Sequence, residues 1–471
     1  MRSTTGARPS PRALLARAAT RSLDVQYYIW HDDLSGSLLL HEMRVAADRG
    51  VRVRMLLDDN GIAGLDARLA AIDGHPNVEV RLFNPFVVRS PKMIGYLADF
   101  PRLNRRMHNK SFTADNQVTI IGGRNVGDEY FGAQDEGLFA DLDVLAVGPA
   151  VTDVSRDFDC YWASASAYTA ASILPAVARE RIGDIATAAA AAARAPAAQA
   201  YLEAVRSLPI VDQLRAGTLA LEWAPVRMVS DDPAKALGRA GAEGLLTAKL
   251  AEILGEPKSE LALVSGYFVP TEAGEDAFVG LAREGVPVSI LTNAFETTDV
   301  AIVHADYAGR RKALLRGGVR LFEMRKLGPA VADRSNFSLV GSGSGSGNGR
   351  GVGGPGSVAR ASASTLHAKT FSVDRQRMFV GSFNFDPRSM RLNTELGFVI
   401  DSPTLAATLP NSFATDIPLR AYEVRLTDAD DLVWIERNGD RVIRHTVEPG
   451  TTWLQRLLVR VLSYLPIEWL L

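Results

Sequence analysis

Short apolar runs and longer helix-like stretches alternate along the chain, and the alternation occurs twice in the same order. Six runs rich in β-branched and aromatic residues form two sets of three: LDVQYYIW (23–30), VRVRMLLDD (51–59) and VEVRLFN (78–84), then LALVSGYFV (261–269), VPVSILTNA (286–294) and VRLFEM (319–324). Helix-like stretches separate the runs, which is typical of strands joined by crossover helices. The pattern predicts an α/β fold of two similar α/β/α sandwich lobes with mixed, largely parallel sheets, related by pseudo-twofold symmetry.

The segments beside these sets divide the chain further. An alanine-rich stretch interrupted by prolines separates the halves and favours connecting helices. A Gly/Ser-rich run in the second half can bury almost nothing and is expected to be a mobile loop. The expected parts are an N-terminal tail (1–20), a first lobe (21–165), a helical connector (166–215), a second lobe (216–446) with the mobile loop (341–363), and an amphipathic C-terminal tail (447–471).

Composition narrows the class of protein. The chain has 471 residues, of which 47% are hydrophobic, so it can bury at least one large core. Its 52 basic and 54 acidic residues leave a net charge of −2, and no general positive field recommends nucleic acid as a partner. Cys160 is the only cysteine, which excludes an internal disulfide, and its aromatic neighbours favour a buried position.

The strongest signal is a motif that occurs twice without a gap. MHNKSFTADNQVTIIGGRN (107–125) aligns with LHAKTFSVDRQRMFVGSFN (366–384), so each shared residue lies 259 positions from its partner, as 367 does from 108. The shared residues are His108, Lys110, Asp115, Gly122 and Asn125 in the first copy, and His367, Lys369, Asp374, Gly381 and Asn384 in the second. One copy alone would more often be structural, whereas two copies in register indicate a shared function.

Each copy combines a nucleophile or acid with a cation. In a strand, alternate side chains share a face, so the histidine and the lysine of H-x-K should point the same way. The run after the aspartate is expected to return as the second strand of a hairpin, ending in small residues that permit close approach to a ligand. Lysine charge, asparagine amides and backbone N–H groups suit a phosphate. The residues expected to hold it are Gly122, Gly123, Asn125, Gly381, Ser382 and Asn384.

Two copies of the motif would allow both histidines to act on one phosphodiester. If the lobes pack about a twofold axis, one histidine can attack phosphorus while the other protonates the leaving oxygen. The lysines and asparagines would offset the charge of the transition state, so we expect neither a metal nor another cofactor.

Each histidine also needs a carboxylate that fixes its tautomer. Candidates occur downstream of each motif at the start of an apolar strand, Asp141 after the first and Glu395 after the second. Asp143 competes with Asp141, and an exposed carboxylate at a strand edge is the alternative interpretation for both candidates.

The duplicated HxKxxxxD motif, followed by GGxN or GSxN, resembles the phospholipase D superfamily, and with its flanking strands the resemblance covers nearly the whole chain. It implies a bilobal α/β/α fold, a phosphohistidine intermediate and no metal. It further implies that His108 is the nucleophile and His367 the general acid. LDVQYYIWHDDLSG (23–36) and EPGTTWLQRLLVRVLSYLPIEWLL (448–471) resemble bacterial cardiolipin synthases, particularly those of the C type, which transfer a phosphatidyl group to a lipid alcohol.

This resemblance implies phosphatidylglycerol and phosphatidylethanolamine as lipid partners and a position at the bacterial cell membrane. The protein would be peripheral or anchored by a segment missing upstream, with no nucleic acid as partner and an accessory protein left open. From Trp453 to Tyr464, apolar residues recur at helical spacing with Arg456 and Arg460 on another side. That pattern favours either an interfacial helix or a tail packed on the core.

Rival interpretations remain at this point. A hydrolytic phospholipase D producing phosphatidic acid is the nearest, because the sequence does not separate water from an alcohol as acceptor. A superfamily nuclease is the second, and the near-neutral charge and the C-terminal tail argue against it. Arg102, Arg105 and Arg106, just before the first motif, either meet anionic headgroups or form an ordinary solvated loop.

Overall fold

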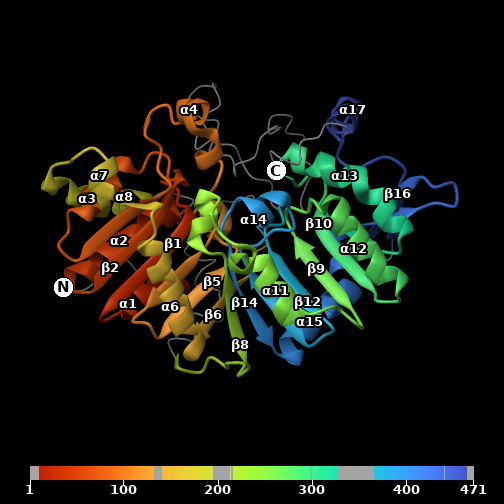
Figure 1. Cartoon of the computed structure of the whole chain (residues 1–471), viewed down its shortest axis with the longest axis horizontal. Helices are drawn as coiled ribbons and strands as arrows, with labels where there is room; N and C mark the ends of the chain where they lie inside the picture. The colour runs from red at the N-terminus through yellow and green to blue at the C-terminus, as the bar shows by residue number, and fades with distance from the viewer. Residues whose placement is uncertain are drawn as a thin grey trace. The chain divides into compact units, whose positions relative to one another are not determined.

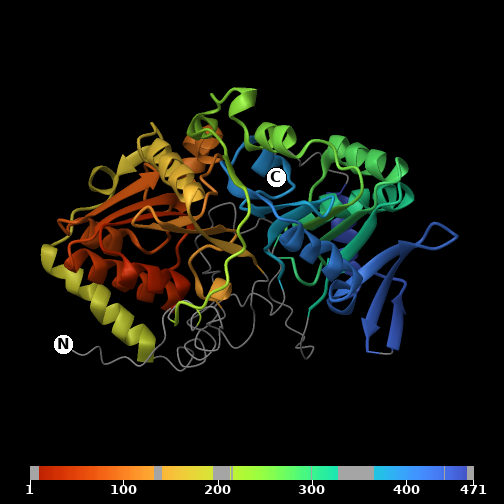
Figure 2. The same ribbon diagram turned by 90° about the horizontal axis from the view of Figure 1, so that it is seen from below.

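The computed structural model describes residues 10–131, 141–194, 213, 216–298, 300–326, 365–439 and 441–463. Contacts divide the chain into two compact units. The first takes in Met1–Leu138, Asp143–Trp223 and Ala236–Arg239, and the second Phe139–Leu142, Ala224–Lys235 and Ala240–Leu471. Each unit contains one mixed sheet with helices on both faces (Figure 1 and Figure 2). The predicted mobile loop at 341–363 lies outside the described residues.

The first unit is built on a seven-stranded sheet in the order β6-β5-β4-β1-β2-β3-β7. Its strands are β1 (Ser22–Ile29), β2 (Arg52–Gly61), β3 (Val78–Phe83), β4 (Ser111–Ala114), β5 (Val118–Gly122), β6 (Asp143–Val147) and β7 (Ala167–Thr169). Its helices are α1 (Pro11–Ala18), α2 (Leu34–Asp48), α3 (Asp66–Asp73), α4 (Met93–Leu103), α5 (Asp128–Phe131), α6 (Pro149–Trp162), α7 (Ala170–Ile173) and α8 (Gly183–Arg194), with a 3₁₀ turn at Arg179–Ile182.

The two faces of this sheet bury different helices because side chains alternate along a strand. Met55 of β2 lies in a core cluster with residues of α1, α2 and α8. Leu56, the next residue, lies on the other face with Phe158 and Tyr161 of α6. The sheet of the first unit is therefore enclosed between two apolar layers.

The second unit is built on a ten-stranded sheet in the order β17-β16-β15-β11-β10-β9-β12-β13-β14-β8. Its strands are β8 (Val226–Ser230), β9 (Leu261–Ser265), β10 (Val288–Asn293), β11 (Arg320–Met324), β12 (Lys369–Val373), β13 (Arg377–Gly381), β14 (Leu396–Asp401), β15 (Ala421–Leu426), β16 (Leu432–Asn438) and β17 (Arg441–His445). Its helices are α11 (Leu246–Leu254), α12 (Thr271–Arg283), α13 (Ala301–Arg316), α14 (Pro387–Arg391), α15 (Pro403–Ala414), α16 (Ile417–Arg420) and α17 (Trp453–Leu462), with a 3₁₀ turn at Ala242–Gly244. Another 3₁₀ turn, Pro233–Leu237, begins in the second unit and ends in residues that group with the first.

The second sheet is also covered on both faces. Leu263 of β9 packs with Phe278 of α12 and Leu314 of α13. Its neighbour Val264 faces the opposite layer, with Phe413 of α15. The predicted α/β fold with sheets enclosed by helices is confirmed.

The internal repeat is visible in the strand pairing. β1, β2 and β3 pair in parallel, as do β9, β10 and β11. The motif hairpin then pairs antiparallel to the first strand of its set, β4 with β1 and β12 with β9. All six predicted strands are present, and the predicted hairpins are β4–β5 and β12–β13.

One detail of the expected fold is wrong. The sheets are mixed but not largely parallel. Among the described strands, both motif hairpins pair antiparallel, and so do the pairs β5–β6, β13–β14, β11–β15 and β15–β16. Described residues of the expected connector and N-terminal tail pack on the first unit. α8 buries Ile185 and α1 buries Ala13 and Ala16 in the core of the first unit, and β7 pairs with β3.

Cys160 is exposed, contrary to expectation. It lies on α6 between Phe158 and Tyr161, which both turn into the core. The same aromatic neighbours that favoured burial are therefore the side chains that place the thiol on the outer side of the helix.

Candidate active site

His108 and Lys110 stand directly before the β4–β5 hairpin, not within β4, which begins at Ser111. The ammonium of Lys110 donates to the carbonyl oxygen of His108 at 2.5 Å and lies 5.4 Å from the centre of the Tyr28 ring. The Tyr28 and His108 rings meet edge to face, 5.0 Å apart. Lys110 is 1% exposed, so a buried cation is held over the Tyr28 ring that also contacts the imidazole.

The second copy repeats this arrangement. Lys369 opens β12, and its ammonium donates to the carbonyl oxygen of His367. The same nitrogen lies 3.1 Å from Nδ1 of the His367 ring. The structure therefore brings the histidine and the lysine together in both copies.

The second histidine has a carboxylate partner from the other half of the sequence. Oδ2 of Asp141 lies 2.6 Å from Nδ1 of His367, and the Asp141 side chain is fully buried. Asp143, its competitor, instead pairs with Arg12 at 2.8 Å. An orienting carboxylate for His367 was expected, but the sequence placed Asp141 beside the first motif because it follows that motif in the chain.

Asp115 and Asp374, the last residues of the two motifs, lie at the turns of the hairpins. Asp115 accepts backbone N–H groups of Arg21 at 2.8 Å and Ser22 at 2.9 Å, where the chain enters β1. Asp374 accepts those of Lys258 at 2.9 Å and Ser259 at 2.6 Å, before β9. A strand between histidine and aspartate separates them by seven residues, roughly 20 Å when extended. The structure therefore does not bring either aspartate to its histidine.

Both aspartates also take up a left-handed backbone, with φ near 55° for Asp115 and Asp374 and for the residue after each. Two such residues in succession make the tight turn that fits the twist of a hairpin, and Asp is one of the residues that tolerate it. Burial raises the pKa of each carboxyl, but the backbone N–H donors outweigh it and leave the pKa lowered. These contacts support a structural role for both aspartates, and a catalytic role for them stays a prediction.

The two motif asparagines differ in their surroundings. Asn125 accepts the N–H of Ile29 at 3.3 Å and donates to the hydroxyl of Tyr130 at 2.9 Å. Asn384 is 4% exposed, and its Oδ1 has no hydrogen-bond partner among the described residues. A buried amide in that state is suited to a ligand.

The small residues of the motifs serve the sheet. A side chain at Gly381 would meet the carbonyl oxygen of Leu396 at 2.4 Å, so glycine is required by the neighbouring strand. Gly122 ends β5 opposite Asp143, and Gly123 after it is buried. Their binding of phosphate stays a prediction.

Ser382 and Glu395 form a buried pair behind the second motif. The Ser382 hydroxyl donates to Oε2 of Glu395 at 2.5 Å and accepts the N–H of Leu396 at 3.0 Å. The backbone N–H of Glu395 donates to Asp231 at 2.9 Å. Glu395 is therefore anchored at both its backbone and its side chain, and its role as an orienting carboxylate stays a prediction.

Sequence reasoning missed two further acids around this pair. Burial and the charge of Glu395 raise the pKa of Asp386 to about 6, although the N–H of Ser389 partly offsets them. Burial also raises the pKa of Asp231 to about 6, against the pull of Lys235, whose ammonium lies 2.9 Å away. The sequence did contain a signal for the position of Asp386. Asp386 is followed by Pro387, and this pair indicates the start of a helix, because Asp caps helices and proline suits their first turn.

The arginines before the first motif are mostly structural. Arg106 is fully buried and donates to Asp58 at 3.1 Å and to the carbonyl oxygen of Leu103 at 2.7 Å. Arg102 donates to Asn84 at 2.6 Å. Neither the headgroup role nor the solvated loop fits these two residues.

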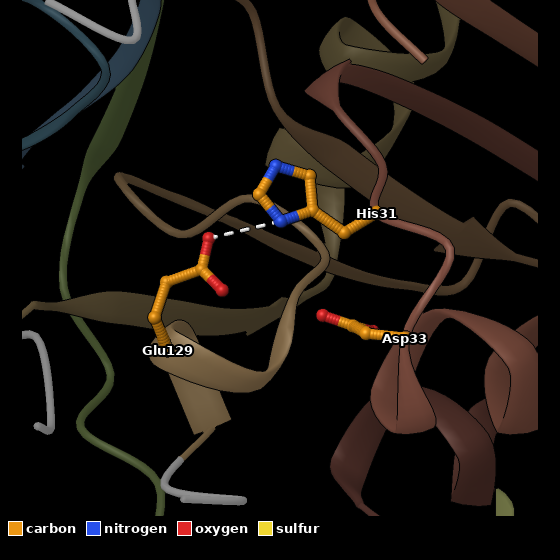
Figure 3. Close-up of side chains that lie close together, drawn as sticks. All are labelled: His31, Asp33 and Glu129. Carbon is orange, nitrogen blue, oxygen red and sulfur yellow. Dashed lines mark ion pairs between the residues drawn. The ribbon is translucent and has the colours of Figure 1, made fainter. Parts of the chain in front are cut away.

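His31, Asp33 and Glu129 are the described residues whose ligand atoms lie close enough to hold a metal ion, all within 4.8 Å of one another (Figure 3). They are already engaged with the protein. His31 faces Glu129 at 3.2 Å, and Asp33 accepts the N–H groups of Gly36 at 2.9 Å and Asp128 at 2.7 Å. Burial and Asp128 raise the pKa of Asp33 to about 7. An ion pair and a helix cap account for this cluster, and metal-free chemistry stays a prediction.

The chain is similar to known proteins over nearly its whole length. The family described as "Cardiolipin synthase, PLD-like domain" matches residues 13–162 and 352–417, which include both histidines. Cardiolipin synthase C of Escherichia coli (strain K12) is 46% identical over 460 residues, covering 98% of this chain and 93% of that protein. An uncharacterized protein of Helicobacter pylori (strain ATCC 700392 / 26695) is 28% identical over 476 residues, covering 97% of this chain and 86% of that one.

Among solved structures, phosphatidylserine synthase of Haemophilus influenzae Rd KW20 matches with a TM-score of 0.58. The match covers 95% of this chain and 89% of that one, at 14% sequence identity. At that identity it supports the fold alone.

Proposed function

Because the chain belongs to the cardiolipin synthase family of phospholipase D-like proteins, we propose that it is a phosphatidyltransferase that forms cardiolipin. The donor is phosphatidylethanolamine or a second phosphatidylglycerol, and the acceptor is a hydroxyl of phosphatidylglycerol. The observation that carries the proposal is the duplicated histidine–lysine pair, with the ammonium on the histidine carbonyl in both copies.

In the first step, His108 attacks the donor phosphorus and the bond to the headgroup oxygen breaks. His367 gives that oxygen a proton, so a neutral alcohol leaves and a phosphatidyl group remains on His108. In the second step, His367 takes the proton of the acceptor hydroxyl, whose oxygen attacks the phosphorus and releases His108. The proton that His367 gives up in the first step is thus replaced in the second step.

Asp141 supports the assignment of His367 as the acid and base. A carboxylate on Nδ1 fixes the tautomer and stabilises the imidazolium that forms when the other ring nitrogen takes a proton. Lys110 and Lys369 supply positive charge where the phosphorane oxygens become more negative.

We propose that the protein acts at the bacterial membrane, as expected for a relative of cardiolipin synthase C. None of the described helices has the length and apolar character of a membrane span. α17 instead packs Val459 and Leu462 on the second unit and exposes Trp453, Leu454 and Leu457. The buried side of α17 fits a tail packed on the core, and its exposed apolar side supports an interfacial helix.

Purified full-length protein, incubated with phosphatidylglycerol vesicles with and without phosphatidylethanolamine, tests the proposal by mass spectrometry of the lipid products. We expect cardiolipin, unaffected by a chelator, and a loss of about 10²- to 10⁴-fold in His108→Ala and His367→Ala. His445→Ala is the matched control, because it removes a histidine paired with a carboxylate, Glu436, outside the motifs. Phosphatidic acid without cardiolipin would instead make the protein a hydrolase.

A further inference from the structure

The segment before His108 presents apolar side chains to solvent. The exposed fractions are 87% for Val87, 50% for Ile94, 90% for Leu97 and 38% for Phe100. We call these four residues the α4 surface. Figure 1 shows α4 beyond the strand ends of the first sheet. Exposed apolar side chains gathered on one short segment mark an interaction site, whereas scattered ones do not.

Two basic residues of the same segment, Arg89 and Lys92, are largely withdrawn from solvent. Arg89 is paired with Asp59 and with Asp66, and the Lys92 ammonium lies 3.0 Å from Asp59. The pKa of Lys92 is lowered by this burial, although Asp59 opposes the effect. A surface helix of a water-soluble protein usually does the reverse, burying its apolar side and exposing its charges. The segment is thus held with its apolar side outward.

Buried contacts fix the segment at both ends. Phe86 is fully buried before α4, and Leu103 is 1% exposed at its end. Arg106 then binds the carbonyl oxygen of Leu103 and the carboxylate of Asp58, which also accepts the N–H of Met107 at 2.8 Å. His108 is the next residue, so the anchored end of α4 leads directly into the first motif.

We propose that the α4 surface docks on a phospholipid bilayer and enters its interfacial layer, presenting His108 to headgroup phosphates. This inference rests on the proposed function, because a substrate that lies in a bilayer requires the enzyme to meet the bilayer near its nucleophile. Charge is compatible with anionic lipid. The acid of residues 86–103, Asp99, is paired with Arg102 at 2.5 Å, so its charge is offset and does not oppose contact with anionic headgroups.

The test compares wild-type protein with the double variant Ile94→Asp, Leu97→Asp. Both positions are at least half exposed, so the fold should persist, and a melting curve checks this. The probe is a vesicle of phosphatidylglycerol and phosphatidylethanolamine, used in flotation and in the cardiolipin assay. Short-chain phosphatidylglycerol below its micelle concentration serves as a substrate that needs no docking. Val442→Asp on β17, 60% exposed, is the matched control.

We expect the double variant to lose at least 10-fold in vesicle binding and in activity on vesicles while its rate on the monomeric lipid stays within about twofold, and Val442→Asp to behave as wild type. Equal losses on both substrates, unchanged vesicle binding, or the same loss in the control would overturn the inference. A wild-type dimer that the double variant converts to a monomer would also overturn it, because the surface would then join two copies. Wild-type protein that binds vesicles through α4 but makes no product from either lipid would overturn the proposed function alone.

Discussion

The Asp141 carboxylate and the imidazole of His367 form a buried pair, 2.6 Å between Oδ2 and Nδ1, although 226 positions separate the two residues. Asp141 precedes β6 of the first unit, yet it groups with the second unit. The second motif is therefore completed by residues that precede it in the chain, and a variant at position 141 should act on His367.

Asp141→Asn should lower kcat by about 10²- to 10⁴-fold with little change in KM. The amide keeps the size of the side chain but removes the charge that stabilises the imidazolium and fixes its tautomer. Steady-state rates on mixed lipid micelles give kcat and KM, and a circular dichroism spectrum checks that the variant is folded.

Asp143→Asn is the control for this prediction. It weakens the ion pair with Arg12 and should lower stability while leaving kcat within a few-fold. Wild-type kcat in the Asp141 variant, or an equal fall in both variants, would contradict the orienting role.

Asp374→Ala should destabilise the second unit without disabling the chemistry. The carboxylate holds the backbone N–H groups of Lys258 and Ser259, and their loss should cost about 1–3 kcal/mol of unfolding free energy. Because the folded pKa of Asp374 is lowered, this contribution is present above the unfolded pKa and is lost as pH falls through the folded one. Urea unfolding at pH 7 and at low pH measures it.

Asp374→Asn is the matched variant, since Asn also tolerates the left-handed turn. We expect it to be intermediate in stability, with kcat near that of the wild type in both variants. A collapse of kcat at unchanged stability would return Asp374 to the catalytic residues.

A feature of the fold could be predicted from the sequence when it depends on residues that are close together in the chain. The strand sets and the motif hairpins were predictable because alternation and turn residues are local. The β6–β5 pairing, and the packing of α8 on the first core, depend on contacts between distant segments that periodicity does not contain. The same limit explains Asp141: chain order assigned it to the first motif, while packing assigns it to His367.

Asp386→Asn should stabilise the protein at neutral pH but not at pH 4. Asp386 is buried with a pKa of about 6, above the usual value near 4, so the folded state binds more protons than the unfolded state between these two values. Wild-type stability therefore falls as pH rises from about 4 to 6 and is level above. Asn keeps the helix cap on Ser389 but does not titrate.

The expected difference is on the order of 1–3 kcal/mol at pH 7.5 and near zero at pH 4. Chemical denaturation of both proteins at the two pH values measures it. The same difference at both values would show that Asp386 does not carry a proton in the folded state.

Leu457→Glu should weaken the binding of the protein to anionic vesicles. α17 is secured by a capping box between Thr452 and Gln455, and Val459 and Leu462 pack with Phe295, so the helix stays in place while Leu457, half exposed, is free to meet lipid. The new carboxylate opposes both apolar insertion and the attraction of Arg460 for anionic headgroups. We expect at least fivefold weaker binding at low salt, and a smaller salt dependence than in the wild type.

Leu419→Glu on α16 is the control, because Leu419 is exposed to nearly the same degree, 49% against 50% for Leu457. Both variants should keep wild-type stability within about 0.5 kcal/mol, since neither side chain is buried. Vesicle sedimentation at two salt concentrations compares them. Because α17 lies in the second unit and the α4 surface in the first, equal binding by the Leu457 variant and the wild type would leave the first unit as the sole carrier of membrane contact.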